Sequence, residues 1–369
     1  VLGKTEGNGC VNDFTRAFAT TVLKRFFAEA LELPEHTVAE RIAFVMSGGT
    51  EGGLSPHWLV FEVHDTPSTR PGEPGLAAGI AFTEAFSPER IGRLDQVRAT
   101  AEAVRRAMAE AGIERPEDVH YVQIKCPLLT AARCNDARRR GASVATSDTY
   151  ESMGYSRGAS ALGVAVALGE VDDTALTDDT ICHDFGLWSS RASTSAGIEL
   201  MRNEILVLGN APGWEPALRI GHDVMADALD GDALDRALAP LGGDAAGELA
   251  ALLVKAEPSR SGEIRGRRHA MWDDSDINAT RHARALVGGV LAPIWPQGAA
   301  LGLALAMVCG WGVTIAGTPY SANALLLERL TGYPARIGAL RWNWPLSAAA
   351  LLVAGGLGAL LTLLLAPAA

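Results

Sequence analysis

Tyr121-Val122-Gln123-Ile124-Lys125 is an apolar, β-prone run that ends in one lysine, and the chain contains this pattern twice more. The other copies are Val1-Leu2-Gly3-Lys4 and Leu252-Leu253-Val254-Lys255. Apolarity followed by a single charge is typical of a buried strand whose last residue emerges at a site. The recurrence predicts three tandem units, each with a strand that ends in a lysine.

A second pattern follows each lysine. A hydroxyl residue and an arginine precede an alanine-rich stretch three times, as Thr15-Arg16, Ser156-Arg157 and Thr280-Arg281. The apolar spacing predicts helices over residues 17–33, 158–170 and 282–292. Each serine or threonine is expected to cap its helix, because its oxygen accepts a backbone N–H of the first turn. Each arginine would then face outward from that turn.

A third pattern occurs in two of the units. Ser47-Gly48-Gly49-Thr50-Glu51 and Ser195-Ala196-Gly197-Ile198-Glu199 both read Ser-small-Gly-x-Glu, and no third copy follows Arg281. Small residues after the serine let a ligand approach backbone N–H groups closely, as an oxyanion site requires. The order lysine, arginine, serine is the same in both units.

Three such units around one axis would bring lysine, arginine and serine side chains to a common pocket. That arrangement matches a small planar ligand of near-threefold symmetry that carries three carbonyls, because arginine offers forked donors to carbonyl edges. A lysine among other cations and away from water becomes a neutral base near neutral pH. A neutral lysine beside a serine activates the hydroxyl without a histidine, which predicts acyl transfer at an amide carbonyl.

Five segments carry a more specific signature: Gly3-Lys4-Thr5-Glu6-Gly7-Asn8-Gly9, Ser47-Gly48-Gly49-Thr50-Glu51-Gly52, Lys125-Cys126-Pro127-Leu128-Leu129, Ser152-Met153-Gly154-Tyr155-Ser156-Arg157-Gly158 and Asp274-Ser275-Asp276-Ile277-Asn278-Ala279-Thr280-Arg281. In this order they resemble the cyanuric acid hydrolase/barbiturase family of ring-opening amidohydrolases, over residues 1 to 292. The family's third Ser-Gly-Gly, its C-terminal metal loop and the first strand and helix of its first repeat have no match in this sequence.

The resemblance implies an α/β fold of three homologous repeats around an internal pseudo-threefold axis, with the third repeat incomplete here, usually in a homotetramer. It implies hydrolysis of cyanuric acid to carboxybiuret and then biuret. The alternatives are a barbiturase, which converts barbituric acid to ureidomalonate, and an inactive, membrane-tethered fusion of the same module. Linkers rich in proline and glycine set the expected boundaries at 1–66, 75–211, 216–297 and a tail over 298–369.

The resemblance also implies roles for single residues. Lys125 would be the general base and Ser195 the nucleophile, with Lys4 and Lys255 as the equivalent lysines of the other repeats. Substrate contacts would come from Arg16, Ser47, Gly48, Arg157, Ser195, Ala196 and Arg281. The chemistry would need no cofactor, but a structural divalent cation, Mg²⁺ or Ca²⁺, would bind near the third repeat, with Glu257 as its acidic ligand.

The tail differs from the rest of the chain. No charged residue lies between Arg284 and Glu328 or after Arg341. Gly298–Gly317 and Pro345–Leu365 each have about the 20 residues that span a bilayer as a helix. Two interpretations fit, a membrane-embedded pair and a buried helical pair in a soluble domain, and the length favours the first.

Composition narrows the partners and the compartment. Lysine and arginine number 32 against 43 aspartates and glutamates, a net charge of −11, which argues against a nucleic-acid partner because phosphate binding needs clustered cations. The five cysteines form no CxxC pair, so a reducing, cytoplasmic compartment is expected for the hydrolase module. Cys126 is expected to be a packing residue, and His57 and His183 to be structural.

Overall fold

The computed structural model describes residues 1–48, 56–241, 250–256, 263–268 and 290. The chain divides into two compact units, Val1–Thr50 with Ser55–Ala283 and Glu51–Leu54 with Arg284–Ala369. All the described residues except residue 290 belong to the first unit.

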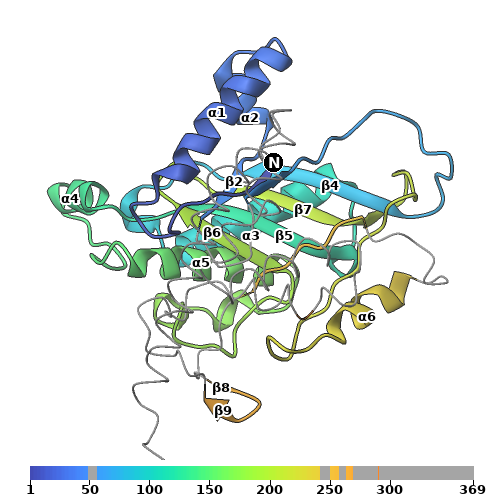
Figure 1. Ribbon diagram of the computed structural model, residues 1–369. Coiled ribbons are helices and arrows are strands. Elements are labelled where there is room, and N and C mark those ends of the chain that lie inside the picture. The colour runs from blue at the N-terminus through green and yellow to red at the C-terminus, as the bar shows by residue number, and fades with distance from the viewer. Residues whose placement is uncertain (49–55, 242–249, 257–262, 269–289, 291–369) are drawn as a thin grey trace, which may run out of the picture. The chain divides into compact units, whose positions relative to one another are not determined.

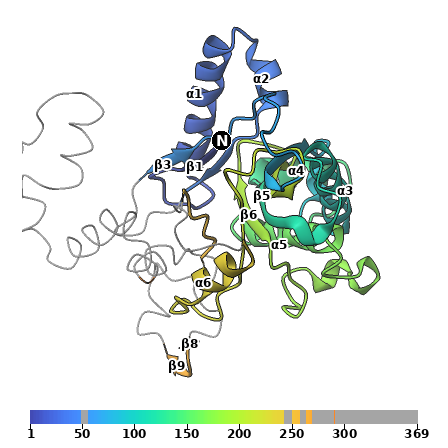
Figure 2. The ribbon, with the colours of Figure 1, turned by 90° about the vertical axis from the view of Figure 1, so that its right-hand side faces the viewer.

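A three-stranded sheet forms from the first 59 residues. Its strands are β1 (Leu2–Lys4), β2 (Val45–Ser47) and β3 (His57–Leu59), in the order β2-β1-β3. Strand β1 is parallel to β2 and antiparallel to β3. Parallel neighbours need a crossover, which α1 (Phe14–Ala30) and α2 (Glu35–Arg41) supply. Figure 2 shows these helices side by side beyond β1 and β3.

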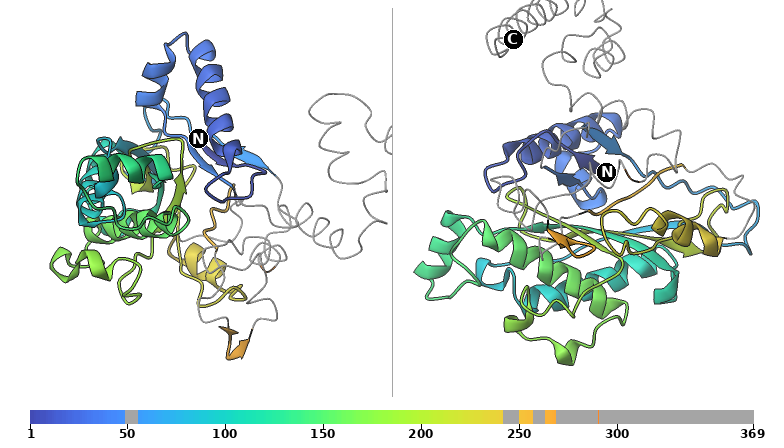
Figure 3. Two further views of the ribbon diagram at one scale, coloured as in Figure 1. Left: turned by 90° about the vertical axis from the view of Figure 1, so that its left-hand side faces the viewer. Right: turned by 60° about the horizontal axis from the view of Figure 1, so that its bottom comes forward.

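A four-stranded sheet forms the larger layer. Its strands are β4 (Gly75–Phe82), β5 (Val119–Pro127), β6 (Ala192–Gly197) and β7 (Glu204–Ala211), in the order β4-β7-β5-β6. Strand β5 is parallel to β6 and antiparallel to β7, which also pairs antiparallel with β4. The helices α3 (Leu94–Glu110) and α5 (Glu151–Ala167) pack on each other and against this sheet (Figures 1 and 3).

The core of this layer is apolar and closely packed. Alternate residues of β4 are buried, as expected for a strand with one face toward helices. The residues Val104, Val122, Ile124, Ile205 and Val207 lie at the centre of the largest buried cluster, and none is exposed to solvent. This core fixes the positions of β5 and β6, whose far ends carry the polar residues described below.

The remaining elements are short. They are the helices α4 (Ala131–Arg139) and α6 (Ala233–Leu238), the strands β8 (Glu263–Ile264) and β9 (Arg267–Arg268), and the 3-10 turns Pro88–Arg90, Pro116–Asp118, Asp173–Ala175, Asp178–Thr180 and Ala239–Leu241.

The two sheets share one pattern of connections. In each, a strand that ends in or runs through a lysine pairs in parallel with a later strand that carries a serine, and antiparallel with the strand after that. The expected strands at Lys4 and Lys125 are therefore confirmed, together with the α/β class. The larger sheet has one additional strand, β4, before its lysine strand.

Three local predictions are wrong. Residues 250–256, which include the third lysine run, adopt no regular structure, because an apolar run becomes a strand only where a neighbour supplies ladder hydrogen bonds. Asp13, not Thr15, caps α1, and its carboxylate accepts the N–H of Thr15. Helix α5 begins at Glu151, so Ser156 and Arg157 lie within it instead of at its start.

Several predictions fall outside the described residues. These are the helix expected over 282–292, apart from residue 290, and the tail over 298–369 with its two apolar runs. Within the part of the chain that the structure describes, no helix combines the length and apolarity needed to cross a membrane.

Candidate active site

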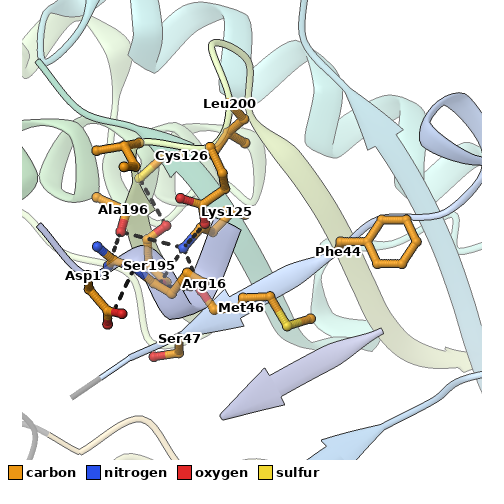
Figure 4. A network of polar contacts seen from close by, with 12 residues as sticks. Asp13, Arg16, Phe44, Met46, Ser47, Lys125, Cys126, Ser195, Ala196 and Leu200 are labelled. Carbon is orange, nitrogen blue, oxygen red and sulfur yellow. Dashed lines mark hydrogen bonds and ion pairs between the residues drawn. The ribbon is translucent and has the colours of Figure 1, made fainter. Parts of the chain in front are cut away.

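Lys125 and Ser195 occupy paired positions in the parallel strands β5 and β6. The Nζ atom of Lys125 lies 3.3 Å from the Oγ atom of Ser195, and the lysine side chain is completely buried. Strand pairing sets this separation, because parallel neighbours hold register partners at a fixed spacing. Figure 4 shows both side chains in one network of polar contacts.

The smaller sheet completes this network. Lys125 Nζ donates to the carbonyl oxygen of Met46 in β2 at 2.5 Å, and Ser195 Oγ donates to the same oxygen at 3.4 Å. Strand β2 therefore reaches the end of β5 and β6 with its backbone (Figure 4). The site thus combines side chains of the larger sheet with main-chain groups of the smaller one.

The equivalent pair of the smaller sheet is Lys4 and Ser47, which are register partners in β1 and β2. Lys4 is 5% exposed, and its Nζ atom donates to the carbonyl oxygen of Gly48 at 2.8 Å. The carbonyl of Ser47 accepts the backbone N–H of Thr5 at 2.9 Å. The predicted substrate segment at Ser47 and Gly48 is therefore held at the end of β1 by two hydrogen bonds, one to each of its carbonyl oxygens.

Arg16 extends from the first turn of α1 to Ala196. Its guanidinium is 2% exposed and donates to the carbonyl oxygens of Ala196 and Cys10, each at 2.7 Å. Asp13 Oδ2 lies 3.8 Å from Arg16 Nε. A Cβ atom at Gly48 would lie 1.8 Å from the same carboxylate oxygen, so the absence of a side chain there leaves room for the Asp13 carboxylate. Arg16 is therefore held beside the residue that follows Ser195.

Glu199 is the site residue to which the sequence analysis gave no role. Its Oε1 atom lies 2.8 Å from Lys125 Nζ, and its side chain is 6% exposed. A Cβ atom at Gly197 would lie 2.1 Å from the carboxylate, so the glycine leaves room for it. The signal was present, because glutamate ends the Ser-small-Gly-x-Glu pattern in both units.

Burial and neighbouring charges set the protonation of this cluster. Burial lowers the pKa of Lys125, and the Arg16 charge acts in the same direction, whereas Glu199 opposes both. Burial also works against the ionisation of Glu199, but the attraction of the nearby Lys125 charge outweighs it and lowers the pKa of Glu199. Burial raises the pKa of the Cys126 thiol, which agrees with its expected packing role. The cluster favours a lysine that loses its proton more readily than usual.

The other predicted site residues are distributed as follows. Arg157 is half-buried in α5, where its charge acts on the Cys126 thiol. Lys255 is half-buried in the irregular segment 250–256 instead of at a strand end. Arg281 and Glu257 lie outside the described residues, and the residues that are described contain no group of three or more histidine, cysteine, aspartate or glutamate side chains suited to a metal ion.

A buried lysine beside a serine, with an arginine and a carboxylate around them, has the parts of a serine–lysine acyl-transfer site. The fold and the cluster thus define an α/β protein whose site contains the residue types of a hydrolase. The sequence profile of the amidohydrolase ring-opening protein family matches residues 1–301, and the chain belongs to that family. This confirms the resemblance drawn from the sequence.

Individual relatives agree. The chain is 71% identical over 298 residues to a cyanuric acid amidohydrolase of Ectopseudomonas oleovorans, covering 79% of this chain and 82% of the relative. It is 56% identical to the cyanuric acid amidohydrolase of Enterobacter cloacae, covering 80% and 82% of the two chains.

Two solved structures are similar over the same part of the chain. One is the crystal structure of cyanuric acid hydrolase from A. caulinodans, at a TM-score of 0.71 and 56% identity, covering 80% of this chain and 81% of that one. The other is a cyanuric acid hydrolase described as an evolutionary innovation by structural concatenation, at a TM-score of 0.72 and 48% identity, covering 80% and 83%.

Proposed function

We propose that this chain hydrolyses cyanuric acid, opening the ring at an amide C–N bond to give carboxybiuret, which then yields biuret. The observation that carries the proposal is the buried contact of 3.3 Å between Lys125 Nζ and Ser195 Oγ. Membership of a ring-opening amidohydrolase family and 71% identity to a cyanuric acid amidohydrolase support the choice of substrate.

In the proposed reaction, Ser195 Oγ attacks a ring carbonyl carbon while neutral Lys125 takes the hydroxyl proton. The C–N bond then breaks, and the Lys125 ammonium returns that proton to the departing ring nitrogen. A water molecule hydrolyses the resulting ester and restores the serine. Burial supports this role, because it lowers the pKa of Lys125 and so favours the neutral amine.

Substrate binding is proposed to use groups from each repeat. Arg16, Arg157 and Arg281 would direct forked donors to ring carbonyls, and Ser47, Gly48, Ser195 and Ala196 would hold the ring edges and the oxyanion. The matched pairs Lys4 with Ser47 and Lys125 with Ser195 support repeats over 1–66 and 75–211. By the same logic, residues 216–297 would form the third repeat, with Lys255 as its lysine.

The wider setting is proposed from the same resemblance. The enzyme module would act in the cytoplasm as a homotetramer, and the tail over 298–369 would lie in a membrane. A structural Mg²⁺ or Ca²⁺ would bind near the third repeat, with Glu257 as its acidic ligand. The chain's own side chains supply the chemistry.

The test is to incubate the purified full-length chain separately with cyanuric acid and barbituric acid. Loss of ultraviolet absorbance would report ring opening, and biuret would be identified among the products. Turnover of cyanuric acid is expected. Turnover of barbituric acid alone would support the barbiturase, and turnover of neither by chain that is folded by circular dichroism would overturn the proposed function.

A further inference from the structure

The oxygen atoms around Lys125 determine how the N–H groups and the lone pair of its amine are oriented. Two oxygens lie at short distance from Nζ, Glu199 Oε1 at 2.8 Å and the Met46 carbonyl at 2.5 Å, whereas Ser195 Oγ is more distant at 3.3 Å. A neutral amine has two N–H groups and one lone pair. The Glu199 contact is an ion pair and not an aligned hydrogen bond, because both carboxylate oxygens lack a hydrogen-bond partner. If the Met46 carbonyl accepts one N–H group and the Glu199 charge attracts the other, the lone pair is left for the serine hydroxyl.

We propose that Glu199 is a positioning residue for the Ser195–Lys125 pair, which directs the lone pair of neutral Lys125 at the serine and stabilises the ammonium that forms during attack. The inference rests on the proposed function and assigns a part in it to a residue outside the serine–lysine pair. In that step the Ser195 O–H bond breaks and an N–H bond forms on Lys125. The serine oxygen meanwhile bonds the carbonyl carbon, whose oxygen takes the negative charge.

The charges around Lys125 make such a partner necessary. Arg16 approaches from α1 and disfavours a second positive charge nearby, and the buried Cys126 thiol, next to Lys125 in β5, is held neutral. Glu199 therefore supplies the negative charge that the buried ammonium needs. A buried ion without a partner is strongly disfavoured, because the low-dielectric interior does not replace the solvation that the ion loses.

The backbone around Glu199 is held independently. Arg133 in α4 donates to the carbonyl oxygens of Ile198 at 2.8 Å and Leu200 at 3.2 Å, the residues on either side of Glu199. The Glu199 charge in turn acts on the Arg133 guanidinium. The carboxylate thus extends from a fixed segment, and its position does not depend on its contact with Lys125 alone.

Two roles can be separated by experiment. A residue that serves only the fold would, when changed, lower stability and leave both the plateau kcat and the pH dependence of activity in place. A positioning residue changes the pH at which Lys125 becomes a base. Removing the Glu199 charge takes away an interaction that raises the pKa of Lys125, so that pKa falls and the acidic limb of the activity profile moves to lower pH.

The experiment measures kcat/KM for cyanuric acid against pH in the full chain and in Glu199→Gln. Glutamine keeps an acceptor oxygen but removes the charge. We expect the acidic limb to move to lower pH by about one pH unit or more, because an opposite charge at this distance changes a pKa by that amount. We also expect kcat at the plateau to fall at least tenfold, about the loss of 1.4 kcal/mol of transition-state stabilisation.

A second variant leaves the carboxylate in place but displaces it. Gly197→Ala puts a Cβ atom where the flexible end of Glu199 lies, so the fold survives and the carboxylate moves. The limb should move in the same direction as in Glu199→Gln. The matched control is Glu170→Gln, which neutralises a mostly buried carboxylate 2.7 Å from Arg191 at the opposite end of β6, and it should leave the limb unchanged.

The proposal fails if Glu199→Gln and the control behave alike, or if the limb stays in place while only kcat falls. Nuclear magnetic resonance titration of ¹³C-labelled lysine side chains gives a readout that needs no turnover. If the unaltered chain is inactive but the Lys125 signal titrates lower in Glu199→Gln, the proposed function fails and the placement of Glu199 stands. An unchanged Lys125 titration would overturn the inference whether or not the chain is active.

Discussion

Lys125 and Ser195 are register partners in neighbouring parallel strands, so the backbone, and not a chance meeting of flexible side chains, sets their approach. Lys4 and Ser47 have the same relationship in the smaller sheet. Lys125 contacts Glu199 and the Met46 carbonyl, and Lys4 donates to the carbonyl of Gly48. The family resemblance assigns the catalytic role to the pair in the larger sheet, which predicts unequal contributions to activity.

Substitutions in the two pairs should therefore have unequal effects. Ser195→Ala removes the nucleophile and Lys125→Met removes the base, and each should reduce kcat by about a thousandfold or more. Ser47→Ala should retain measurable activity, because that hydroxyl serves binding. Single-turnover and steady-state assays on variants checked by circular dichroism would measure this, and equal losses from all three would contradict a single catalytic pair.

Gly48→Ala should weaken substrate binding through Arg16. The added Cβ would collide with the Asp13 carboxylate, which caps α1 and faces the guanidinium. We expect KM for cyanuric acid to rise about tenfold or more, because a misplaced arginine loses its forked contact with a carbonyl. Gly72→Ala is the control, since a Cβ there meets nothing within 4 Å. An unchanged KM in Gly48→Ala would contradict this role for Arg16.

Glu204 should control stability in a pH-dependent way. Its buried carboxylate accepts the backbone N–H of Phe44 at 2.9 Å, and burial raises its pKa. A carboxyl with a raised pKa stabilises the fold below its unfolded pKa, and this contribution is lost as pH rises through the folded value. Glu204→Gln keeps an acceptor without the charge, so its melting temperature should exceed that of the unaltered chain at pH 8 but not at pH 4.

The matched variant Glu204→Leu removes the acceptor as well as the charge. It should lower the free energy of unfolding by about 1–3 kcal/mol, because the N–H of Phe44 is left buried without a partner. Thermal melts of both variants at the two pH values would test this. A Glu204→Gln protein less stable than the unaltered chain at pH 8 would show that the ionised carboxylate is favourable.

His120 and His222 should make the fold sensitive to acid. Their Nδ1 atoms lie 2.8 Å apart, so one proton fits between them. Burial, with the charges of His222 and Arg191, lowers the pKa of His120 to about 4, and burial also lowers that of His222. Because these values lie below the unfolded value of about 6.5, their contribution to stability is complete above that pH and is lost as pH falls toward 4.

The measurement is the melting temperature between pH 7.5 and 4.5. It should fall with pH in the unaltered chain and fall less in His120→Gln, which cannot be protonated. His36→Gln, at an exposed position in α2, is the control and should keep the slope of the unaltered chain. If the melting temperature falls with pH equally in all three proteins, the His120–His222 pair does not contribute to the loss of stability in acid.

The sequence alone predicted those features of the site that depend on residue type along one strand. The lysine at the end of an apolar run and the serine that starts a small-residue segment were both found in this way. The sequence placed Lys125 and Ser195 in one site, but their pairing as register partners is a finding of the structure, because residue types do not fix the register of two parallel strands. The α/β class and the ring-opening amidohydrolase family were also accessible from motifs.

Other features were beyond sequence reasoning for physical reasons. The Met46 carbonyl is a main-chain group, and no residue type indicates which carbonyl a distant lysine will contact. Glu199 was recognisable as the glutamate that recurs at the end of the Ser-small-Gly-x-Glu pattern. Its ion-pair partner, however, is determined by tertiary packing. The cap of α1 was misplaced because Asp13, Thr15 and their neighbours all offer suitable oxygens, and local geometry decides among them.

The Met46 carbonyl comes from one sheet and the pair that it contacts comes from the other. If the two sheets were on separate molecules, Lys125 would lose this acceptor whenever the molecules separated. Because one chain carries both sheets, the effective concentration of the acceptor at the amine is set by the chain and not by the amount of protein in solution. Dilution of the protein should therefore leave this contact intact.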